Sequence, residues 1–261
     1  MTDRRQRQKD LRAARVEEER RLAARREMRK RILLAIGIGL GLAAAFLIVG
    51  SLSNRPATLP ASYLALREQP TACGAEQPPI PDPAPTFAAP VDQALDPAPS
   101  VTATLITSCG DIIIELDHVN YPLTVNSFVF LARENFYDAL VFHRIFANFV
   151  IQDGDPRADG SGGPGYTIPD EFPANDFVYE PGVAAMANRG PGTTGSQFFI
   201  VIGDDARVLN PTYSILGQVI AGSETLDLID DVPTAVQPNS AERSRPLETV
   251  YIEDVVIAVE P

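Results

Sequence analysis

The chain has 261 residues and a formal net charge of −12, and its charges are unevenly distributed. Residues 1–31 carry 13 basic and 6 acidic side chains, whereas the rest of the chain carries 9 basic and 28 acidic ones. Because nucleic-acid binding needs a basic face, the acidic body excludes nucleic acid as the main partner. Two cysteines and two histidines are too few for a multi-ligand zinc or iron–sulfur site, so we expect no metal and no cofactor.

Residues 32–50 form an apolar run of nineteen residues without a charge. As a helix the run spans roughly 28 Å, close to the thickness of a bilayer's hydrocarbon core. The basic segment 1–31 precedes it, so the positive-inside rule predicts a single-pass protein of the cell membrane with a cytoplasmic N-terminus. The lipid bilayer is then a partner through residues 32–50. A cleaved signal peptide is the alternative, but the run is long for one and no good cleavage site follows.

Residues 51–100 contain 11 of the 23 prolines of the chain. This composition is typical of an extended, semi-rigid linker that buries no core. We therefore expect it to hold an extracytoplasmic folded domain, residues 101–261, away from the membrane.

Short runs rich in β-branched and aromatic residues predict strands in that domain. They cover residues 102–107, 111–116, 140–146, 149–152, 183–186, 197–202, 214–219 and 249–259. Pro122 opens a predicted helix, in which apolar residues recur at i, i+3, i+4 and i+7 from Val125. A second helix is predicted over Ser223–Asp230, with Ser223 as a candidate N-cap. About eight short strands with two helices indicate a mainly β fold, a closed β-barrel.

Two segments partly match common motifs of phosphate binding and nucleophilic catalysis, but neither match holds when its neighbouring residues are considered. Residues 160–165 match G-x-G-x-x-G, but Pro164 prevents a helix from opening there, so we interpret the segment as a loop. Gly195-Ser196-Gln197 lacks the full G-x-S-x-G of a nucleophile elbow.

Two segments carry polar residues inside otherwise apolar strands. They are FHRIFANFVIQDGDP at 142–156 and AMANRGP at 185–191, which continues to GSQFFI at 195–200. From the pattern alone, Arg144 is either a functional residue or a buried arginine paired with Asp153 or Asp155.

These segments resemble the cyclophilin family of peptidyl-prolyl cis-trans isomerases. FHRI…FVIQDGD and MAN…GSQFFI are hallmarks of that family in the order found here, and the GGPGY loop at 162–166 agrees with them. The resemblance covers residues 102–259 and points to a membrane-anchored bacterial type. It implies a closed eight-stranded antiparallel β-barrel capped by two helices, and a non-covalent isomerase activity of the EC 5.2.1.8 class.

The resemblance also implies the site. Arg144 matches the catalytic arginine of the family. The residues that match the walls of the proline pocket are Phe149, Val150, Phe199 and Leu209. Those that match the holders of the substrate backbone are Gln152, Ala187, Asn188 and Gln197. Tyr213 stands at the pocket edge where many members carry His, and Val208 stands where eukaryotic members often carry Trp.

The expected partners are proline-containing peptides and unfolded or secreted proteins, whose folding the isomerase would assist outside the cytoplasm. A proline-peptide receptor or chaperone with weak or no turnover is the alternative. A third interpretation is a structural tether, in which segment 1–31 contacts anionic lipid or a cytoplasmic partner.

Cys73 and Cys109 are the two cysteines of the chain. Because the domain is expected in an oxidising compartment, we predict a disulfide between them that pins the linker to the first hairpin. Two free thiols, or pairing to another chain, are the alternatives.

Overall fold

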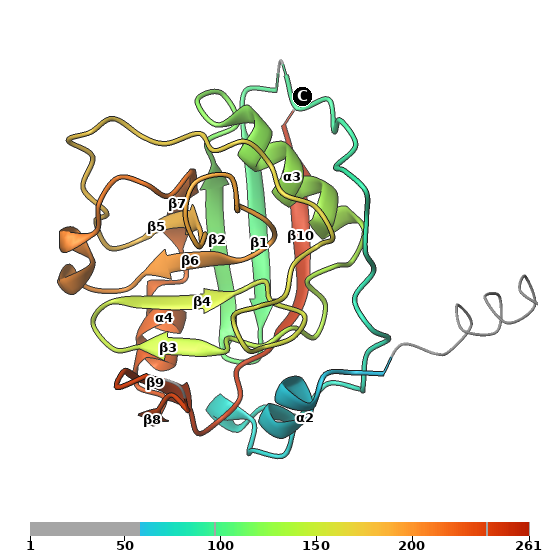
Figure 1. The fold of residues 1–261 in the computed structure, drawn as a ribbon, viewed down its shortest axis with the longest axis vertical. Helices are drawn as coiled ribbons and strands as arrows, with labels where there is room; N and C mark the ends of the chain where they lie inside the picture. Colours follow the sequence, from blue (N-terminus) through green and yellow to red (C-terminus); the bar gives the residue numbers. More distant parts are fainter. Residues whose placement is uncertain (1–57, 97, 239, 261) are drawn as a thin grey trace, which may run out of the picture. The chain divides into compact units, whose positions relative to one another are not determined.

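The computed structural model describes residues 58–96, 98–238 and 240–260, which are built around one large antiparallel sheet (Figure 1). Neighbouring strands follow the order β10-β1-β2-β7-β5-β6-β4-β3. Their bounds are β1 Val101–Thr107, β2 Gly110–Leu116, β3 Arg144–Phe146, β4 Val150–Asp153, β5 Val183–Met186, β6 Phe198–Val201, β7 Ile215–Ala221 and β10 Ile252–Val259. The predicted strands are thereby confirmed, most of them with somewhat different ends.

The first hairpin follows directly from its alternating sequence. In β1 every second side chain is buried, beginning with Val101, and β2 buries Ile112 and Ile114 against the same core. The tight turn pairs Thr107 with Gly110. Gly110 has φ +124°, and a Cβ there would lie 2.7 Å from Thr225 Oγ1, so the turn requires glycine.

Two helices pack on the sheet, as the sequence predicts. They are α3, Pro122–Arg133, which contacts β10 and β7, and α4, Ser223–Asp230, which contacts β2 and β3. Pro122 is in the first turn of α3, as expected. The N-cap prediction for Ser223 is wrong, because Gly222 occupies that position with φ +91°. A Cβ at Gly222 would lie 2.2 Å from the backbone oxygen of Asp111, which explains the glycine.

The sheet curls into a half-barrel and stays open, so the expectation of a closed barrel is wrong. β3 and β10 form the two edges, and within the described residues no ladder joins them. An isolated bridge links Val141 to Tyr251 just before these strands begin. β3 is three residues long, and β9 packs beside it, so a different element covers the edge that a closing strand would need.

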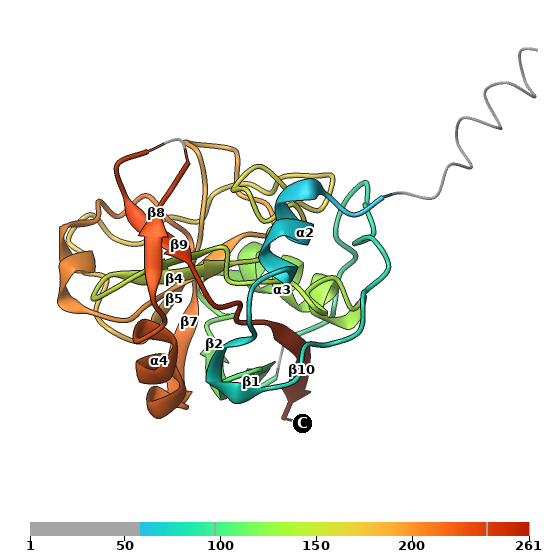
Figure 2. The ribbon, with the colours of Figure 1, turned by 90° about the horizontal axis from the view of Figure 1, so that it is seen from below.

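That element is a hairpin that the sequence analysis missed. It consists of β8, Thr234–Val236, and β9, Arg243–Pro246, which form a separate two-stranded sheet. Figure 2 shows the hairpin on the side of α4, away from α2. Its strands are too short, and one of them too polar, to give a clear alternation.

Residues 58–96 and 98–100, which we call the strap, pack against the domain along its outer side (Figure 1). They include α2, Ala61–Arg67, and a short 3-10 helix, Ala72–Gly74. Tyr63 and Leu66 of α2 pack with Tyr251, and Ala72 and Leu95 join the main core. The expectation that this segment buries no core is therefore wrong for its described part. Its few apolar anchors are spaced too irregularly to show a period.

A disulfide joins Cys73 of the strap to Cys109 in the turn of the first hairpin. The predicted pairing is confirmed. Beside it, the backbone N–H of Ala72 donates to the oxygen of Thr249 at 3.0 Å, so the strap is fastened to the sheet by covalent and hydrogen bonds.

The described residues contain no helix long and apolar enough to cross a membrane. The apolar run 32–50 and the basic segment 1–31 lie outside the described residues, so the membrane span stays a prediction.

Candidate active site

Strand register brings the predicted site residues together. Arg144 of β3 lies opposite Gln152 of β4, and Gln152 lies opposite Phe199 of β6. Residues opposite one another on paired strands point to the same face. The three side chains therefore form one row across the sheet, although up to 55 positions separate them in the sequence.

This row opens into a cavity of about 200 Å³. Nine of the ten residues predicted for the site line it: Arg144, Phe149, Val150, Gln152, Ala187, Asn188, Phe199, Leu209 and Tyr213. The tenth, Gln197, lines a neighbouring cavity and does not line this one. The structure thus gathers the predicted residues around one hollow large enough for a proline ring.

Aromatic rings form the apolar wall of this hollow. Phe199 and Tyr213 meet edge to face, with ring centroids 5.4 Å apart. Behind them the buried hydroxyl of Tyr179 donates to the backbone oxygen of Tyr213 at 2.9 Å and accepts from its N–H at 3.1 Å. Burial raises the pKa of Tyr179 to about 12, so the hydroxyl stays protonated and keeps the Tyr213 backbone in place.

Arg144 is held by an ion pair that the sequence analysis did not anticipate. Its Nε and Nη2 donate to the two carboxylate oxygens of Glu242 at 2.7 and 2.9 Å. Its Nη1 donates to Gln152 Oε1 at 3.4 Å. The guanidinium also lies near the rings of Phe146 and Phe149, 5.7 and 5.6 Å from their centroids.

Neither aspartate suggested as a structural partner of Arg144 fills that role. Asp153 accepts the N–H of Gly154 at 2.5 Å, and burial raises the pKa of its carboxyl well above the usual range. Asp155 accepts the backbone N–H groups of Arg157 and Asp159 at 2.7 and 3.1 Å. Both carboxyls therefore accept backbone N–H groups of the turn after β4, and neither pairs with Arg144, which lines the cavity.

The side-chain amides of Gln152 and Gln197 continue the hydrogen-bonded chain that begins at Arg144. Gln152 Nε2 donates to Gln197 Oε1 at 3.0 Å, and Gln197 Nε2 donates to the backbone oxygens of Gly160 and Gly162 at 3.1 and 2.9 Å. Gln197 thus acts on the site through Gln152 and fixes the glycine loop. Asn188, on the opposite side, is oriented by its own donation to Thr212 O at 2.8 Å.

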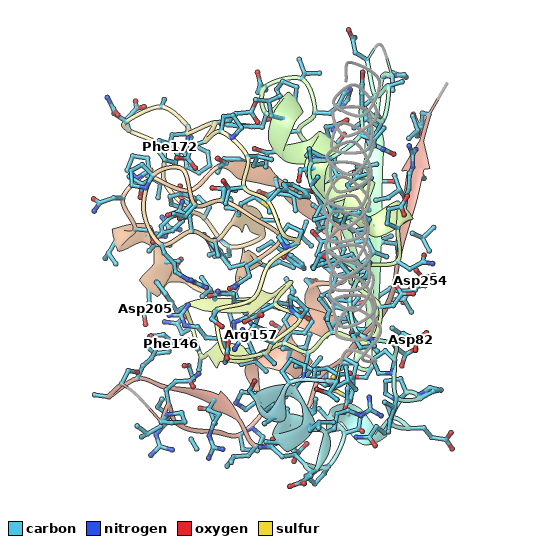
Figure 3. The ribbon with its side chains drawn as sticks, turned by 45° about the vertical axis from the view of Figure 1, so that its right-hand side comes forward. Asp82, Phe146, Arg157, Phe172, Asp205 and Asp254 are labelled. Atoms are coloured by element: carbon cyan, nitrogen blue, oxygen red, sulfur yellow. A yellow bond between two sulfur atoms is a disulfide. The ribbon has the colours of Figure 1, made fainter. Side chains whose placement is uncertain are left out.

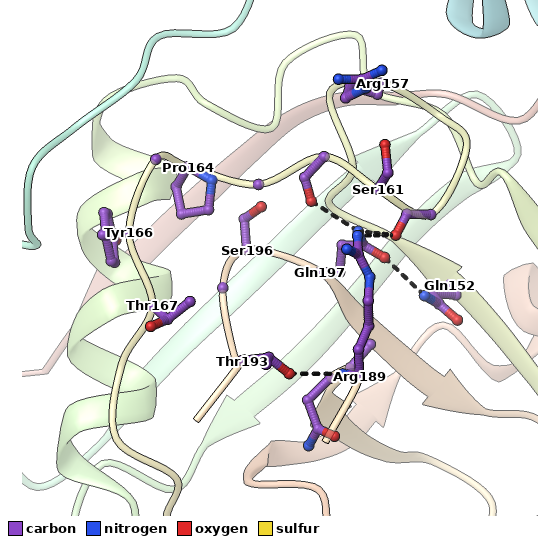
Figure 4. A pocket seen from close by; sticks show the side chains of 17 residues that line it. Gln152, Arg157, Ser161, Pro164, Tyr166, Thr167, Arg189, Thr193, Ser196 and Gln197 are labelled. Carbon is purple, nitrogen blue, oxygen red and sulfur yellow. Dashed lines mark hydrogen bonds between the residues drawn. The ribbon is translucent and has the colours of Figure 1, made fainter. Parts of the chain in front are cut away.

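The loop at 160–167 forms a wall of a second cavity of about 830 Å³, shown in Figure 4. The two cavities share Gln152, Ala187 and Asn188. A peptide whose proline occupies the small cavity can therefore extend into the larger one. Arg157 and Arg189 line the larger cavity and give it a basic character.

Comparison with known proteins agrees with this geometry. The sequence model of the family described as cyclophilin type peptidyl-prolyl cis-trans isomerase/CLD matches residues 102–257. The chain belongs to this family. A cyclophilin-type isomerase of the EC 5.2.1.8 class is thus established for the domain.

Curated relatives and solved structures similar to this cyclophilin come from several organisms. Peptidyl-prolyl cis-trans isomerase B of Streptomyces anulatus is 41% identical over 177 residues, which are 61% of this chain and 98% of the relative. Peptidyl-prolyl cis-trans isomerase A of Mycobacterium tuberculosis is 40% identical over 178 residues, 62% of this chain and 94% of the relative. A cyclophilin type isomerase of Cryptosporidium parvum, solved by crystallography, aligns with a TM-score of 0.55 and 32% identity over 62% of this chain and 99% of its own.

Glu242 is the site residue that sequence reasoning missed. It lies between β8 and β9, 98 positions after Arg144, in a polar segment without hydrophobic periodicity. Its carboxylate reaches the arginine because the hairpin packs beside β3. A local pattern carries no signal for such a pairing. Val208, by contrast, is 82% exposed and lines neither of the two cavities.

Proposed function

We propose that the cyclophilin domain isomerises X–Pro bonds by stabilising the twisted amide with Arg144. Amide resonance sets a barrier of about 18–20 kcal/mol to this rotation. The twisted state has a pyramidal prolyl nitrogen with a free lone pair, and a guanidinium aimed at that nitrogen stabilises this state alone. Arg144 at the edge of a proline-sized cavity with an aromatic wall is the observation that supports the mechanism.

The magnitudes show why the cavity matters as much as the arginine. A turnover of about 10–1,000 per second requires a barrier roughly 4–7 kcal/mol below that of the free peptide. A charged hydrogen bond contributes about 1.5–3 kcal/mol. The remainder comes from excluding water from the amide and holding the peptide on both sides. The rings of Phe199 and Tyr213 serve the first purpose, and Gln152 and Asn188 the second.

Replacing Arg144 tests the mechanism. In the full chain kept in detergent, Arg144→Ala is expected to lower kcat for an X–Pro peptide about 10- to 150-fold, the rate equivalent of a charged hydrogen bond. NMR exchange spectroscopy measures the rate, and Arg133→Ala, an exposed arginine of α3 outside both cavities, is the control. Unchanged exchange in Arg144→Ala would contradict the mechanism.

The same experiment tests the receptor alternative. The specific observation in its favour is that Glu242 already engages two N–H groups of Arg144. For a receptor, chemical-shift titration would show that the peptide binds. Cis–trans exchange of its X–Pro bond would then be equally slow with the wild type and with Arg144→Ala. Binding together with fast exchange in the wild type supports the enzyme.

The substrates we propose are proline-containing segments of unfolded or secreted proteins outside the cytoplasm. In support, the Cryptosporidium parvum relative has been crystallised in the presence of the dipeptide Ala-Pro. The Cys73–Cys109 disulfide is typical of proteins that act in oxidising compartments. The first observation supports proline-containing peptides as substrates, and the second supports action outside the cytoplasm.

The anchor that this role needs is residues 32–50, with residues 1–31 in the cytoplasm. Carbonate extraction of membranes that contain the full chain tests the anchor, and protease treatment of intact right-side-out vesicles tests its orientation. We expect the chain to resist extraction and the isomerase domain to be digested from outside, while an epitope tag on the N-terminus stays protected. Release by carbonate, or protection of the domain, would contradict the proposal.

A further inference from the structure

The ion pair between Arg144 and Glu242 uses one defined edge of the guanidinium. The carboxylate accepts from Nε and Nη2 together, in the two-bond geometry that fixes the plane of the group as well as its position. Both side chains are partly buried, with 23% of Arg144 and 28% of Glu242 exposed. This pairing is therefore better shielded from water than a surface ion pair.

The opposite end of the guanidinium faces the cavity. Nη1 reaches Gln152, and Arg144 and Gln152 both line the cavity, whereas Glu242 is not among its lining residues. Of the five N–H groups of an arginine, Glu242 occupies two and Gln152 one. The remaining N–H groups lie on Nη1 and Nη2, where a peptide in the cavity can meet them. Glu242 thus holds the arginine from behind without blocking the place where the substrate binds.

Glu242 is itself fixed within the hairpin. Its Oε1 accepts the hydroxyl of Ser244, its backbone N–H donates to Ser240 Oγ at 3.1 Å, and its backbone oxygen accepts from Gln237 at 2.8 Å. Gln237 Nε2 also donates to Ser244 Oγ at 3.2 Å. The hydrogen bond from Arg144 lowers the pKa of the Glu242 carboxyl, so it is ionised at neutral pH. The hairpin therefore presents a charged, oriented acceptor to the site.

The other contacts of Arg144 cannot replace this acceptor. The bond to Gln152 is long at 3.4 Å, and attraction to the rings of Phe146 and Phe149 does not fix rotation within the plane of the guanidinium. An arginine has several rotatable bonds, and the freedom of its free side chain opposes any single orientation. Glu242 is the contact that selects one.

We propose that Glu242 is a positioning residue for isomerisation, which holds the guanidinium of Arg144 with its Nη1 end directed at the X–Pro bond. The inference rests on the proposed role of Arg144. It assigns the β8–β9 hairpin a function in catalysis as well as in covering the edge of β3. Since the orientation of Arg144 matters most for the twisted amide, losing Glu242 affects kcat more than KM.

Substitutions of Glu242 in the full chain test the proposal by NMR exchange on an X–Pro peptide. Glu242→Ala is expected to lower kcat about 5- to 20-fold and to change KM by less than about twofold. Glu242→Asp retains the charge on a shorter side chain and is expected to recover part of the loss. Glu253→Ala is the matched control, since it removes an exposed carboxylate from β10 and is expected to leave kcat unchanged.

A double substitution separates positioning from a merely structural role. If Glu242 acts through Arg144, adding Glu242→Ala to Arg144→Ala causes no further loss of kcat. The Nε–H resonance of Arg144 is expected to shift and broaden in Glu242→Ala, while thermal unfolding confirms that the fold persists.

The outcomes distinguish the two proposals. Wild-type kcat in Arg144→Ala overturns the mechanism itself. If Arg144→Ala lowers kcat but Glu242→Ala leaves it at or above the wild-type value, the positioning role alone is overturned. An additive loss of kcat in the double variant overturns it as well. Three results together support the positioning role. Glu242→Ala lowers kcat, Glu242→Asp recovers part of that loss, and Glu242→Ala causes no further loss when Arg144→Ala is already present.

Discussion

The cavity face of the sheet and the strap both join residues that are distant in the sequence, but they are held in different ways. On the cavity face, Arg144, Gln152 and Phe199 meet because the register of three paired strands places them opposite one another. The strap has no such ladder. It is fastened at separate points, through Tyr63, through the disulfide at Cys73 and through a few backbone hydrogen bonds. Figure 3 shows the two regions on opposite sides of the view, marked by Phe146 and by Asp82.

The difference shows what kinds of contact a sequence pattern reveals. A strand alternates with a period of two, so a polar residue within an apolar strand stands out. The strap buries single side chains between long exposed stretches, and its many prolines correctly indicate extended backbone without indicating whether that backbone is in contact with a domain. Composition predicts the conformation of such a segment better than its burial.

The two regions meet at the loop that lines the larger cavity. The backbone N–H of Phe87 in the strap donates to Pro164 O at 2.8 Å, and the hydroxyl of Ser62 donates to Arg157 O. Through these contacts the strap supports the wall of the larger cavity. We therefore expect strap substitutions to act mainly on stability, and substitutions at the small cavity to act mainly on catalysis.

The largest effect is expected from Tyr63→Ala. The side chain is 1% exposed, and its hydroxyl donates to Ala139 O at 2.8 Å. Its removal leaves a cavity and an unpaired buried carbonyl, which should lower the free energy of unfolding by about 3–5 kcal/mol. Tyr63→Phe keeps the ring and should cost about 1–3 kcal/mol. Urea denaturation measures both, and equal stability of the two variants and the wild type would show that the strap is not part of the cooperative unit.

Removing the disulfide is expected to have the next largest effect. The bond links positions 36 residues apart, and cross-links of that span restrict the unfolded chain. Replacing both cysteines, Cys73→Ser with Cys109→Ser, should lower the free energy of unfolding by about 2–4 kcal/mol.

Hydrogen exchange sharpens that prediction. Exchange in the double variant should rise first in the strap, while kcat on a short peptide stays at the wild-type value. A loss of kcat without a loss of stability would mean that the strap controls the catalytic face directly, and would remove the distinction between the two regions.

The smallest effect is expected at the edge of the small cavity. The ring of Tyr213 packs against Phe199, whereas its hydrogen bonds with Tyr179 are made by its backbone N–H and oxygen. Tyr213→Ala should lower kcat/KM about 3- to 10-fold, the equivalent of one aromatic contact, and Tyr213→Phe by less than about twofold. NMR exchange measures both. A large loss in Tyr213→Phe would assign the hydroxyl a role in binding or catalysis that its contacts do not indicate.

The sequence by itself determined the eight strands of the large sheet, the helices α3 and α4, the cysteine pair and nine of the residues around the small cavity, but not the β8–β9 hairpin. Alternation within strands, helical spacing and the resemblance of two segments were enough for the strands, the helices and the cavity residues, because each depends on residues that lie close together in the chain. The cysteine pair followed instead from the number of cysteines and the expected oxidising compartment. Arg144 was found in this way, although its partner was not.

Tertiary structure alone decided that the sheet stays open, that the strap is buried at a few points and that Glu242 holds Arg144. Each of these depends on packing between segments many positions apart, and their favourable energy arises only when the whole domain has assembled. No local period or composition encodes such contacts, so the packing of β9 beside the edge of β3, and with it the orientation of the arginine, is a property of the fold.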